Sequence, residues 1–276
     1  GRTVRDIGDE PVISPILNSF LAQELGDDYG DYFLATEGKV TARFQRDARS
    51  SLTLTAGVND TESLETVARP ASGSFRDNRQ LGTGRLLFAS LNLERSSAGF
   101  TSGRGISGRL YVEAGKLETD QYARVLFAGR AQFPLAGSDV VARARLGWGS
   151  EAWPGHRGFA LGGRGSLIGE PFRAWGGRRV AYGALEWRIP APFFAVPLGA
   201  RVSTGNRLFV VPFIAAGWSG GTLLEGVGLP SGGLRPVAGF GVEWFHSLLR
   251  ADIGMSLRDR TIGVVLDVSR DLWPIL

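Results

Sequence analysis

The chain has 276 residues and a formal net charge of +4, and it contains 40 glycines, 16 phenylalanines and no cysteine. This composition excludes a disulfide framework and favours a turn-rich β protein. Arginine supplies nearly all of the positive charge and recurs along the whole chain, so we expect no nucleic-acid partner, which would need a basic arm or face. The chain starts at Gly1 without a signal peptide, and we therefore expect a mature form or an excised domain.

The first part of the chain predicts one short helix. Residues 1–29 are expected to form an N-terminal helical segment or linker, and residues 30–276 the transmembrane β-barrel described below. Ser14 is a typical N-cap, Pro15 suits the first turn, and Gly26 ends the helix. Apolar runs farther along are shorter than the roughly 20 residues that a membrane helix needs.

From residue 30 onward, apolar and polar residues alternate in segments of about ten residues, the length with which a tilted strand crosses a bilayer. We expect an all-β fold, namely a closed antiparallel transmembrane β-barrel of about 12 strands, an even number as in bacterial single-chain barrels. The predicted strands cover 30–37, 39–45, 52–59, 87–94, 106–114, 123–133, 140–148, 178–190, 207–219, 234–246, 250–258 and 261–269.

A soluble β-sandwich would alternate in the same way, but two features favour the membrane barrel. Tryptophans lie at or near strand ends, as in an interfacial belt, namely Trp148, Trp187, Trp218, Trp244 and Trp273. The polar face combines arginines with carboxylates, which suits a water-filled lumen. We expect the following side chains to point inward: Arg43, Arg109, Arg124, Arg130, Arg143, Arg145, Arg188, Arg250, Glu94, Glu113, Glu186, Glu243, Asp252 and Asp267.

The connections also suit a membrane barrel. The long connections 60–83, 149–178 and 220–233 fall on one side, which corresponds to extracellular loops. Short turns fall on the other side, with 191–207 as a long exception. This topology predicts a periplasmic C-terminus.

The stretch 162–179 is rich in glycine and arginine, and it would form a phosphate cradle only if a helix followed directly. The alternating segment 178–190 follows instead, so we expect a loop with another role. Glycines let the backbone of such a loop pack tightly inside a barrel. The alternative is an exposed, mobile extracellular loop.

Five segments in order, "FALGGRGSLIGEP", "EWRIP", "FIAAGW", "GFGVEW" and "LRADIGMSL", resemble the C-terminal barrel of the bacterial surface antigen superfamily. This group of outer-membrane assembly and translocation barrels includes BamA, TamA and the two-partner secretion translocators. The resemblance implies a bacterial outer-membrane location and a long loop that folds back into the lumen. It also implies that an arginine at the tip of this loop docks against acidic residues of the barrel wall.

By this resemblance the loop tip is Leu167, Ile168, Gly169 and Glu170. Ile168 occupies the arginine position and Glu170 the aromatic position, while Ala215 replaces the aspartate of a wall motif. The docking pair of the family therefore looks dismantled. We expect Arg164, Arg173, Arg178 or Arg179 to anchor the loop instead, with Glu186 or Glu243 as the partner.

The segment 261–268 resembles the signal carried by the last strand of barrels that the outer-membrane machinery processes, with Thr261, Gly263, Leu266 and Val268 at the four positions. The chain departs from the family by ending on "RDLWPIL". No motif of nucleophilic or metal-dependent catalysis is present, so we expect no enzyme activity, no cofactor and no metal.

Three functions remain open from the sequence. The barrel inserts or translocates proteins, or it anchors or exports an upstream soluble domain, or it is a passive pore. The expected partners are outer-membrane lipid and, for the first function, a translocated or inserted polypeptide. A monomeric barrel is expected in each case.

Overall fold

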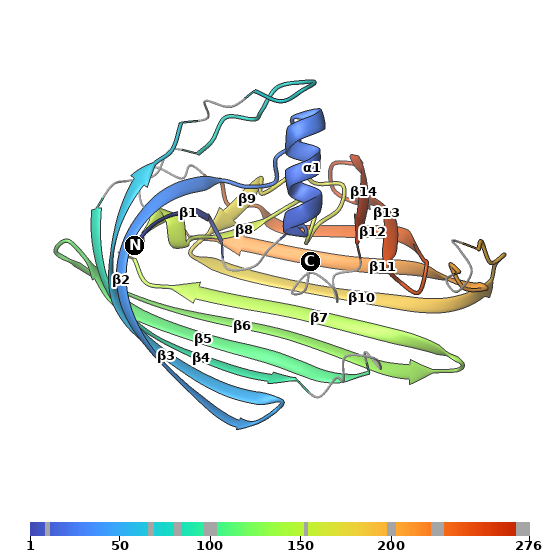
Figure 1. Cartoon of the computed structure of the whole chain (residues 1–276), viewed down its shortest axis with the longest axis horizontal. Coiled ribbons are helices and arrows are strands. Elements are labelled where there is room, and N and C mark those ends of the chain that lie inside the picture. The colour runs from blue at the N-terminus through green and yellow to red at the C-terminus, as the bar shows by residue number, and fades with distance from the viewer. Residues whose placement is uncertain are drawn as a thin grey trace.

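The computed structural model describes residues 1–8, 12–65, 69–79, 84–96, 104–151, 154–197, 203–221 and 229–268. Within these ranges, 12 strands form one antiparallel sheet whose order follows the chain, β1-β2-β3-β4-β5-β6-β7-β10-β11-β12-β13-β14. Figure 1 shows the sheet curling strongly, with β1 and β2 in blue toward one margin and β13 and β14 in red toward the other. The concave face of this sheet is called the inner face below.

The strands are long, because most of them hold 12 to 16 residues. Their bounds are β1 Arg2–Asp6, β2 Tyr32–Asp47, β3 Ser50–Ser63, β4 Gly84–Ser96, β5 Gly105–Leu117, β6 Asp120–Leu135, β7 Ser138–Gly149, β10 Arg179–Pro192, β11 Arg207–Gly220, β12 Gly233–Trp244, β13 Leu249–Ser256 and β14 Ile262–Val268. A second sheet of two short strands, β8 Phe159–Leu161 and β9 Trp175–Gly177, lies within the curve of the main sheet (Figure 1).

The predicted alternation of faces is confirmed by burial. Large apolar side chains of the outer face are exposed, among them Leu146, Leu185, Ile214 and Val264, whose exposed fractions lie between 49% and 69%. Charged side chains of the inner face are buried, namely Glu113, Arg124, Glu186, Glu243, Arg250 and Asp252. A one-residue error of register would exchange the two faces along every strand, so the expected register holds.

The number of strands in the main sheet, 12, agrees with the prediction, but only because one predicted pair of strands is a single strand and one strand was not predicted. The segments 30–37 and 39–45 form a single strand, β2, which pairs with β3 from Phe33 to Asp47. The strand β1 lies within residues 1–29, which were expected to hold only a helix or linker. Its sequence, "RTVRD", is too short to show a clear period of two, and only its pairing with β2 reveals it.

The sheet is open, which corrects the expected closed barrel. Among the described residues, no pairing joins β1 to β14, and these two strands form the margins of the sheet. The first strand has five residues and the last has seven, while the central strands have twice as many. Short outer strands leave few backbone groups that could close the sheet across the gap, which we call the seam.

The predicted helix is confirmed as α1, Pro15–Leu25. The Ser14 side chain accepts a hydrogen bond from the Leu17 amide, and Gly26 adopts the left-handed conformation at φ 75°. No residue of α1 is buried, and Ile16 and Phe20 are 64% and 59% exposed. Among the described helices, none is long and apolar enough to cross a membrane.

The two ends of the sheet differ as expected. The connection that follows β3, the connection from β7 to β10 and the one from β11 to β12 are long and leave the same end. The opposite end carries tight turns such as 48–49 and 136–137, together with the long connection 193–206. Below, the first is called the loop end and the second the turn end. Trp273 and the chain terminus lie outside the described residues.

Candidate functional site: the loop on the inner face

The predicted glycine-rich loop folds onto the inner face of the sheet. It leaves β8, turns at Gly162 and Gly163, and returns to β9 at Trp175. Its tip, Leu167–Glu170, lies over the last two strands, where Gly254 and Gly263 leave room for it. A Cβ atom on Gly254 would lie 2.8 Å from the Ile168 Cβ, and one on Gly263 would lie 2.7 Å from the Gly169 nitrogen. Glycines on both sides therefore permit this close approach.

Apolar contacts hold the tip. Leu167 is fully buried and Ile168 is 4% exposed, and both belong to a cluster with side chains of β11 and β12, including Ala215 and Val237. In the resembling family, the positions of Ile168 and Ala215 hold an arginine and an aspartate. In this chain both positions are apolar members of one buried cluster, so the two replacements are compatible with each other.

Glu170, an acidic residue of the loop, attaches the tip to an arginine of the wall. Its side chain accepts hydrogen bonds from the Ser256 hydroxyl at 2.6 Å and from the Trp175 indole at 2.9 Å, and it lies 3.5 Å from the Arg235 guanidinium. The Arg235 guanidinium also stacks on the Trp175 ring at 3.7 Å. The loop here supplies the acid and the wall supplies the arginine, which reverses the arrangement that the resemblance implies.

Arg164 anchors the loop to the last strand. It donates hydrogen bonds to the Asp267 carboxylate at 2.8 Å and to the Leu266 carbonyl at 2.7 Å, and its guanidinium lies over the Tyr29 ring. Both members of the ion pair are buried, with side chains 5% and 7% exposed. This arginine therefore binds the backbone and a side chain of the β14 margin.

Arg173 anchors the same loop to the other margin. It binds Asp6 at the end of β1 at 2.6 Å and Asp31, just before β2, at 3.2 Å. Asp31 also binds Arg76 at 2.6 Å, and Arg79 donates to the Arg173 carbonyl at 2.9 Å. Burial alone would lower the pKa of Arg173, but Asp6 and Asp31 raise it above its usual value.

The backbone conformation of Arg173 supports its role as an anchor of the loop. Its φ is 45°, a left-handed conformation that costs a residue other than glycine about 1 kcal/mol or more. The ion pairs with the half-buried Asp6 and the buried Asp31 offset that strain. Arg164 and Arg173 thus attach one loop to both margins of the seam.

The expected carboxylate partners of the loop were misassigned. Glu186 accepts hydrogen bonds from Arg143 and Arg250, and Glu243 from Arg188 and Arg250, so both carboxylates bind arginines of the wall. The loop reaches past these strands to β13 and β14 because the glycines there admit its tip. Arg178 pairs with the exposed Glu151, and Arg179 begins β10 and is exposed, so neither takes the predicted anchoring position.

The four positions of the proposed C-terminal signal divide between the two faces. The Thr261 hydroxyl donates to the Gly169 carbonyl at 2.5 Å, and Gly263 lies under the loop tip. Leu266 is 65% exposed on the outer face, and Val268 ends β14. Recognition of this segment by other proteins stays a prediction.

A second buried cluster supports the start of the loop. Glu113 is fully buried, accepts hydrogen bonds from the Tyr111 and Tyr122 hydroxyls, and lies 3.3 Å from Arg124 and 3.7 Å from Arg157. Next to it, His156 is buried against Phe33. Burial, together with the nearby charges of Arg157 and Arg124, lowers the pKa of His156 to about 3.

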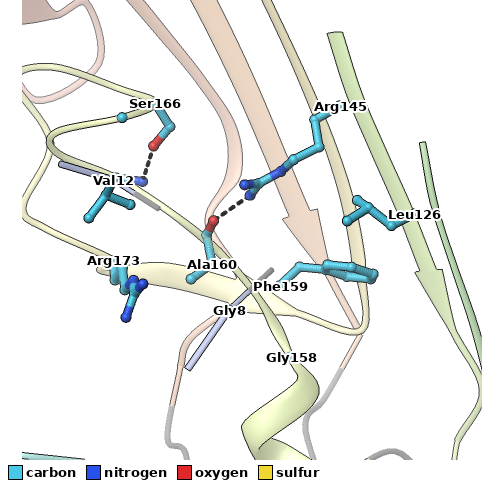
Figure 2. Close-up of a pocket in the computed structure, with 11 residues that line it drawn as sticks. Gly8, Val12, Leu126, Arg145, Gly158, Phe159, Ala160, Ser166 and Arg173 are labelled. Atoms are coloured by element: carbon cyan, nitrogen blue, oxygen red, sulfur yellow. Dashed lines mark hydrogen bonds between the residues drawn. The ribbon is translucent and has the colours of Figure 1, made fainter. Parts of the chain in front are cut away.

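A small cavity of about 40 Å³ separates the loop from the wall and the N-terminal segment (Figure 2). In Figure 2, Arg145 reaches from the wall to the Ala160 carbonyl, to which it donates a hydrogen bond at 2.5 Å. The Ser166 hydroxyl accepts from the Gly162 amide within the loop. The cavity is too small for more than a water molecule or two, so the loop is packed against its surroundings.

Sequence reasoning missed Asp6, Asp31 and Arg235. Asp6 lay in the segment interpreted as a helix or linker, and Asp31 lay in the predicted strand 30–37 but was not considered as a partner of the loop. Glu170 was interpreted only as a departure from a motif. Among the described residues, no group of three or more metal-ligating side chains is present. The arrangement is suited to holding the two margins of a sheet at a defined separation.

Comparison with known proteins gives the fold. No family model matches the sequence, and no curated protein matches it. The structure is similar to the crystal structure of BamA from Haemophilus ducreyi lacking POTRA domains 1-3, with a TM-score of 0.59 and 14% sequence identity. The match covers 86% of this chain and 54% of that chain, so this chain corresponds to about half of that structure. At this identity the likeness establishes a BamA-like barrel fold.

Proposed function

We infer that this chain is a bacterial outer-membrane barrel of the protein assembly or translocation type, whose seam receives a strand of a client polypeptide. The observation that carries this proposal is the pair of margins, β1 and β14, which have no strand partner on their outer edges among the described residues, in a sheet whose outer face is apolar. Unpaired backbone groups in lipid cost several kcal/mol each, so a membrane sheet with free margins has a strong tendency to pair them.

A client strand meets this need by β-augmentation, in which backbone hydrogen bonds give affinity without a particular sequence. The β14 margin is the better template of the two, because it presents seven residues whose outward side chains, Ile262, Val264 and Leu266, are all apolar. The β1 margin has five residues and carries Arg2 and Arg5.

The loop supports the proposal because it is attached to both margins. Arg164 holds β14 and Arg173 holds Asp6 of β1, so the loop limits how far the seam can widen. These are ion pairs and hydrogen bonds, which exchange partners more readily than a continuous ladder of strand pairing. Under this proposal, the loop keeps the seam poised and the client completes the sheet.

Two alternatives make different predictions. A passive pore needs a continuous lumen, and the packed loop occupies the inner face at the loop end. An anchor or exporter for an upstream soluble domain needs no exchange of strands at the seam. We also propose that the chain has no catalytic activity of its own and that its other partner is outer-membrane lipid.

Site-specific photo-cross-linking tests the proposal. A photoreactive residue replaces Val264 on β14, and a matched one replaces Leu185, which is equally apolar and outward-facing but lies on the central strand β10. The protein is folded into liposomes and mixed with a urea-denatured outer-membrane β-barrel protein as the client. We expect cross-links to the client from position 264 and not from position 185.

Equal cross-linking at both positions, or none at either, contradicts a client site at the seam. Single-channel recordings on the same liposomes identify the passive pore by a steady conductance. An anchor barrel gives neither the conductance nor the cross-link.

A further inference from the structure

We propose that the inner face near the turn end forms a binding chamber for acidic polypeptide segments. The chamber has a volume of about 740 Å³ and lies against the inner sides of β2 to β7. Its floor toward the loop end is made by Gly165 and Ser166 of the loop and by Tyr182 of β10. It opens at the turn end, where Ala48 and Arg49 form the turn between β2 and β3.

The charge of this chamber is strongly one-sided. Among the described residues, seven arginines line it, and Glu94 is the one carboxylate. Glu94 lies 3.8 Å from Arg109, and Arg143 is paired with Glu186 of the neighbouring strand β10. Within the described part of the chain, Arg43, Arg49 and Arg95 have no carboxylate partner. The chamber therefore keeps a clear excess of positive charge.

The rest of the inner face is different. On β10 to β13 the arginines Arg188 and Arg250 are matched by Glu186, Glu243 and Asp252 in one buried network. A wall that only had to hold itself together would be balanced in this way throughout. Three arginines without a carboxylate partner among the described residues, Arg43, Arg49 and Arg95, line the open chamber, where a bound anion would supply the missing negative charge.

Carboxylate is the anion that this chemistry fits. Each guanidinium presents a planar fork of donors that matches a carboxylate in a bidentate pair, and several forks on neighbouring strands suit a ligand with several carboxylates. The volume falls in the range of about 300–1,000 Å³ typical of sites for large organic ligands, and it far exceeds the space that a single small anion needs. The choice of a polypeptide over another polyanion rests on the proposed function, since a client entering from the turn end would pass through this chamber.

Binding of a fluorescent oligoglutamate peptide to the full chain, folded in detergent, tests the proposal by anisotropy. The variants are Arg43→Gln and Arg109→Gln, which remove two guanidiniums of the chamber. The matched control is Arg85→Gln, an arginine on the same sheet that is paired with Asp60 at the loop end and is exposed outside the chamber. Heat-modifiable migration on a gel reports whether each variant is folded. Arg43→Lys takes the place of Arg43→Gln if the glutamine variant does not fold.

We expect oligoglutamate to bind and added salt to weaken it. Each glutamine variant should lose about tenfold in affinity, because it removes a charge-assisted hydrogen bond to a carboxylate of the peptide. The Arg85→Gln variant should bind as the wild type does. Arg43→Lys should retain part of the affinity, because it keeps the charge but not the fork.

The proposal is overturned if oligoglutamate does not bind, or if oligolysine binds equally well. It is also overturned if the wild type and the chamber variants bind oligoglutamate with equal affinity, or if the protein binds tripolyphosphate but not oligoglutamate. These outcomes are separate from those of the seam experiment. Cross-linking at position 264 without binding of oligoglutamate contradicts the chamber proposal and supports the proposed function of the seam. Binding of oligoglutamate without that cross-link contradicts the proposed function and supports the chamber.

Discussion

Arg164 of the inner loop and Asp267 of the last strand form a buried ion pair at 2.8 Å, although 103 positions separate them in the sequence. The same arginine donates to the Leu266 carbonyl, so one loop side chain binds both the backbone and a carboxylate of a sheet margin. Through Arg173 the loop also binds Asp6 at the other margin. The loop is therefore the one described segment that connects both sides of the seam through ion pairs.

Removing the charge of Asp267 should release the loop from β14. Asp267→Asn leaves the Arg164 guanidinium buried without its carboxylate, which typically costs about 3–5 kcal/mol. We expect proteolysis after Arg164 to become much faster while the sheet stays folded by heat-modifiable migration. The matched control is Asp60→Asn, which breaks the exposed pair with Arg85 and should leave proteolysis of the loop unchanged. Equal rates for wild type and Asp267→Asn would show that this ion pair does not hold the loop.

Placing at position 168 the arginine that the resemblance implies should destabilise the folded protein when it is the only change. Ile168→Arg places a cation in an apolar cluster, and the expected destabilisation is several kcal/mol. Adding Ala215→Asp to the same chain should recover part of the loss, because the second change supplies the missing carboxylate. Thermal unfolding of the wild type, the two single variants and the double variant measures this coupling. Additive effects of the two changes would contradict the inferred correspondence of these positions.

The connection around His156 should weaken in acid. Burial holds the pKa of His156 at about 3 when folded, against 6.5 when exposed, so the open form binds more protons between these values. The free energy of opening this connection is highest above about pH 6.5 and falls as the pH drops toward 3. At pH 5 it is about 2 kcal/mol lower than at pH 7. The protection factors of the amides of residues 155–158, in which the slower intrinsic exchange in acid is divided out, should therefore fall between pH 7 and pH 5. His156→Phe should abolish this pH dependence, while His246→Gln, at an exposed turn, should retain it.

The outer face should behave as a lipid-facing surface. Leu185 lies on the outer side of the central strand β10, and an arginine there should cost about 2–4 kcal/mol in a bilayer. We expect Leu185→Arg to fold poorly into liposomes, while Ser107→Arg, beside the inner chamber, should fold almost as the wild type does. A Leu185→Arg variant that folds normally and remains monomeric in water without detergent would contradict a membrane location.

Much of the fold could be predicted from the sequence because it depends on local patterns. The alternation in segments such as 250–258 reports which side chains face inward, and Ser14 and Gly26 mark the ends of α1 through local hydrogen bonds and a local backbone conformation. The strand β1 could not be predicted, because five residues carry too short a pattern. Closure of the sheet was wrongly expected, because pairing of the two margins depends on residues more than 250 positions apart.

The candidate site was predicted in part, and for a similar reason. The glycines of 162–179 indicate a tightly packed loop, and Arg164 and Arg173 are among the expected anchors. Their partners were missed because an arginine can reach any carboxylate on the same face of the sheet, and spacing along the chain does not select one. The docking of Glu170 on Arg235 depends on the same kind of long-range placement.

Disulfide formation between loop and wall tests the position of the loop, the central claim of this account, most directly. The natural chain has no cysteine, so a pair introduced by Ile168→Cys and Gly254→Cys reports a single contact. A Cβ atom at position 254 lies 2.8 Å from the Ile168 Cβ, and a relaxation of about 1 Å gives the separation of a disulfide. The control pair combines Ile168→Cys with Leu185→Cys on the outer face. In liposome-folded protein under mild oxidation, the account predicts a rapid cross-link in the first pair and none in the control. Absence of the 168–254 cross-link, or equal cross-linking of both pairs, would contradict a loop held on the inner face across the seam.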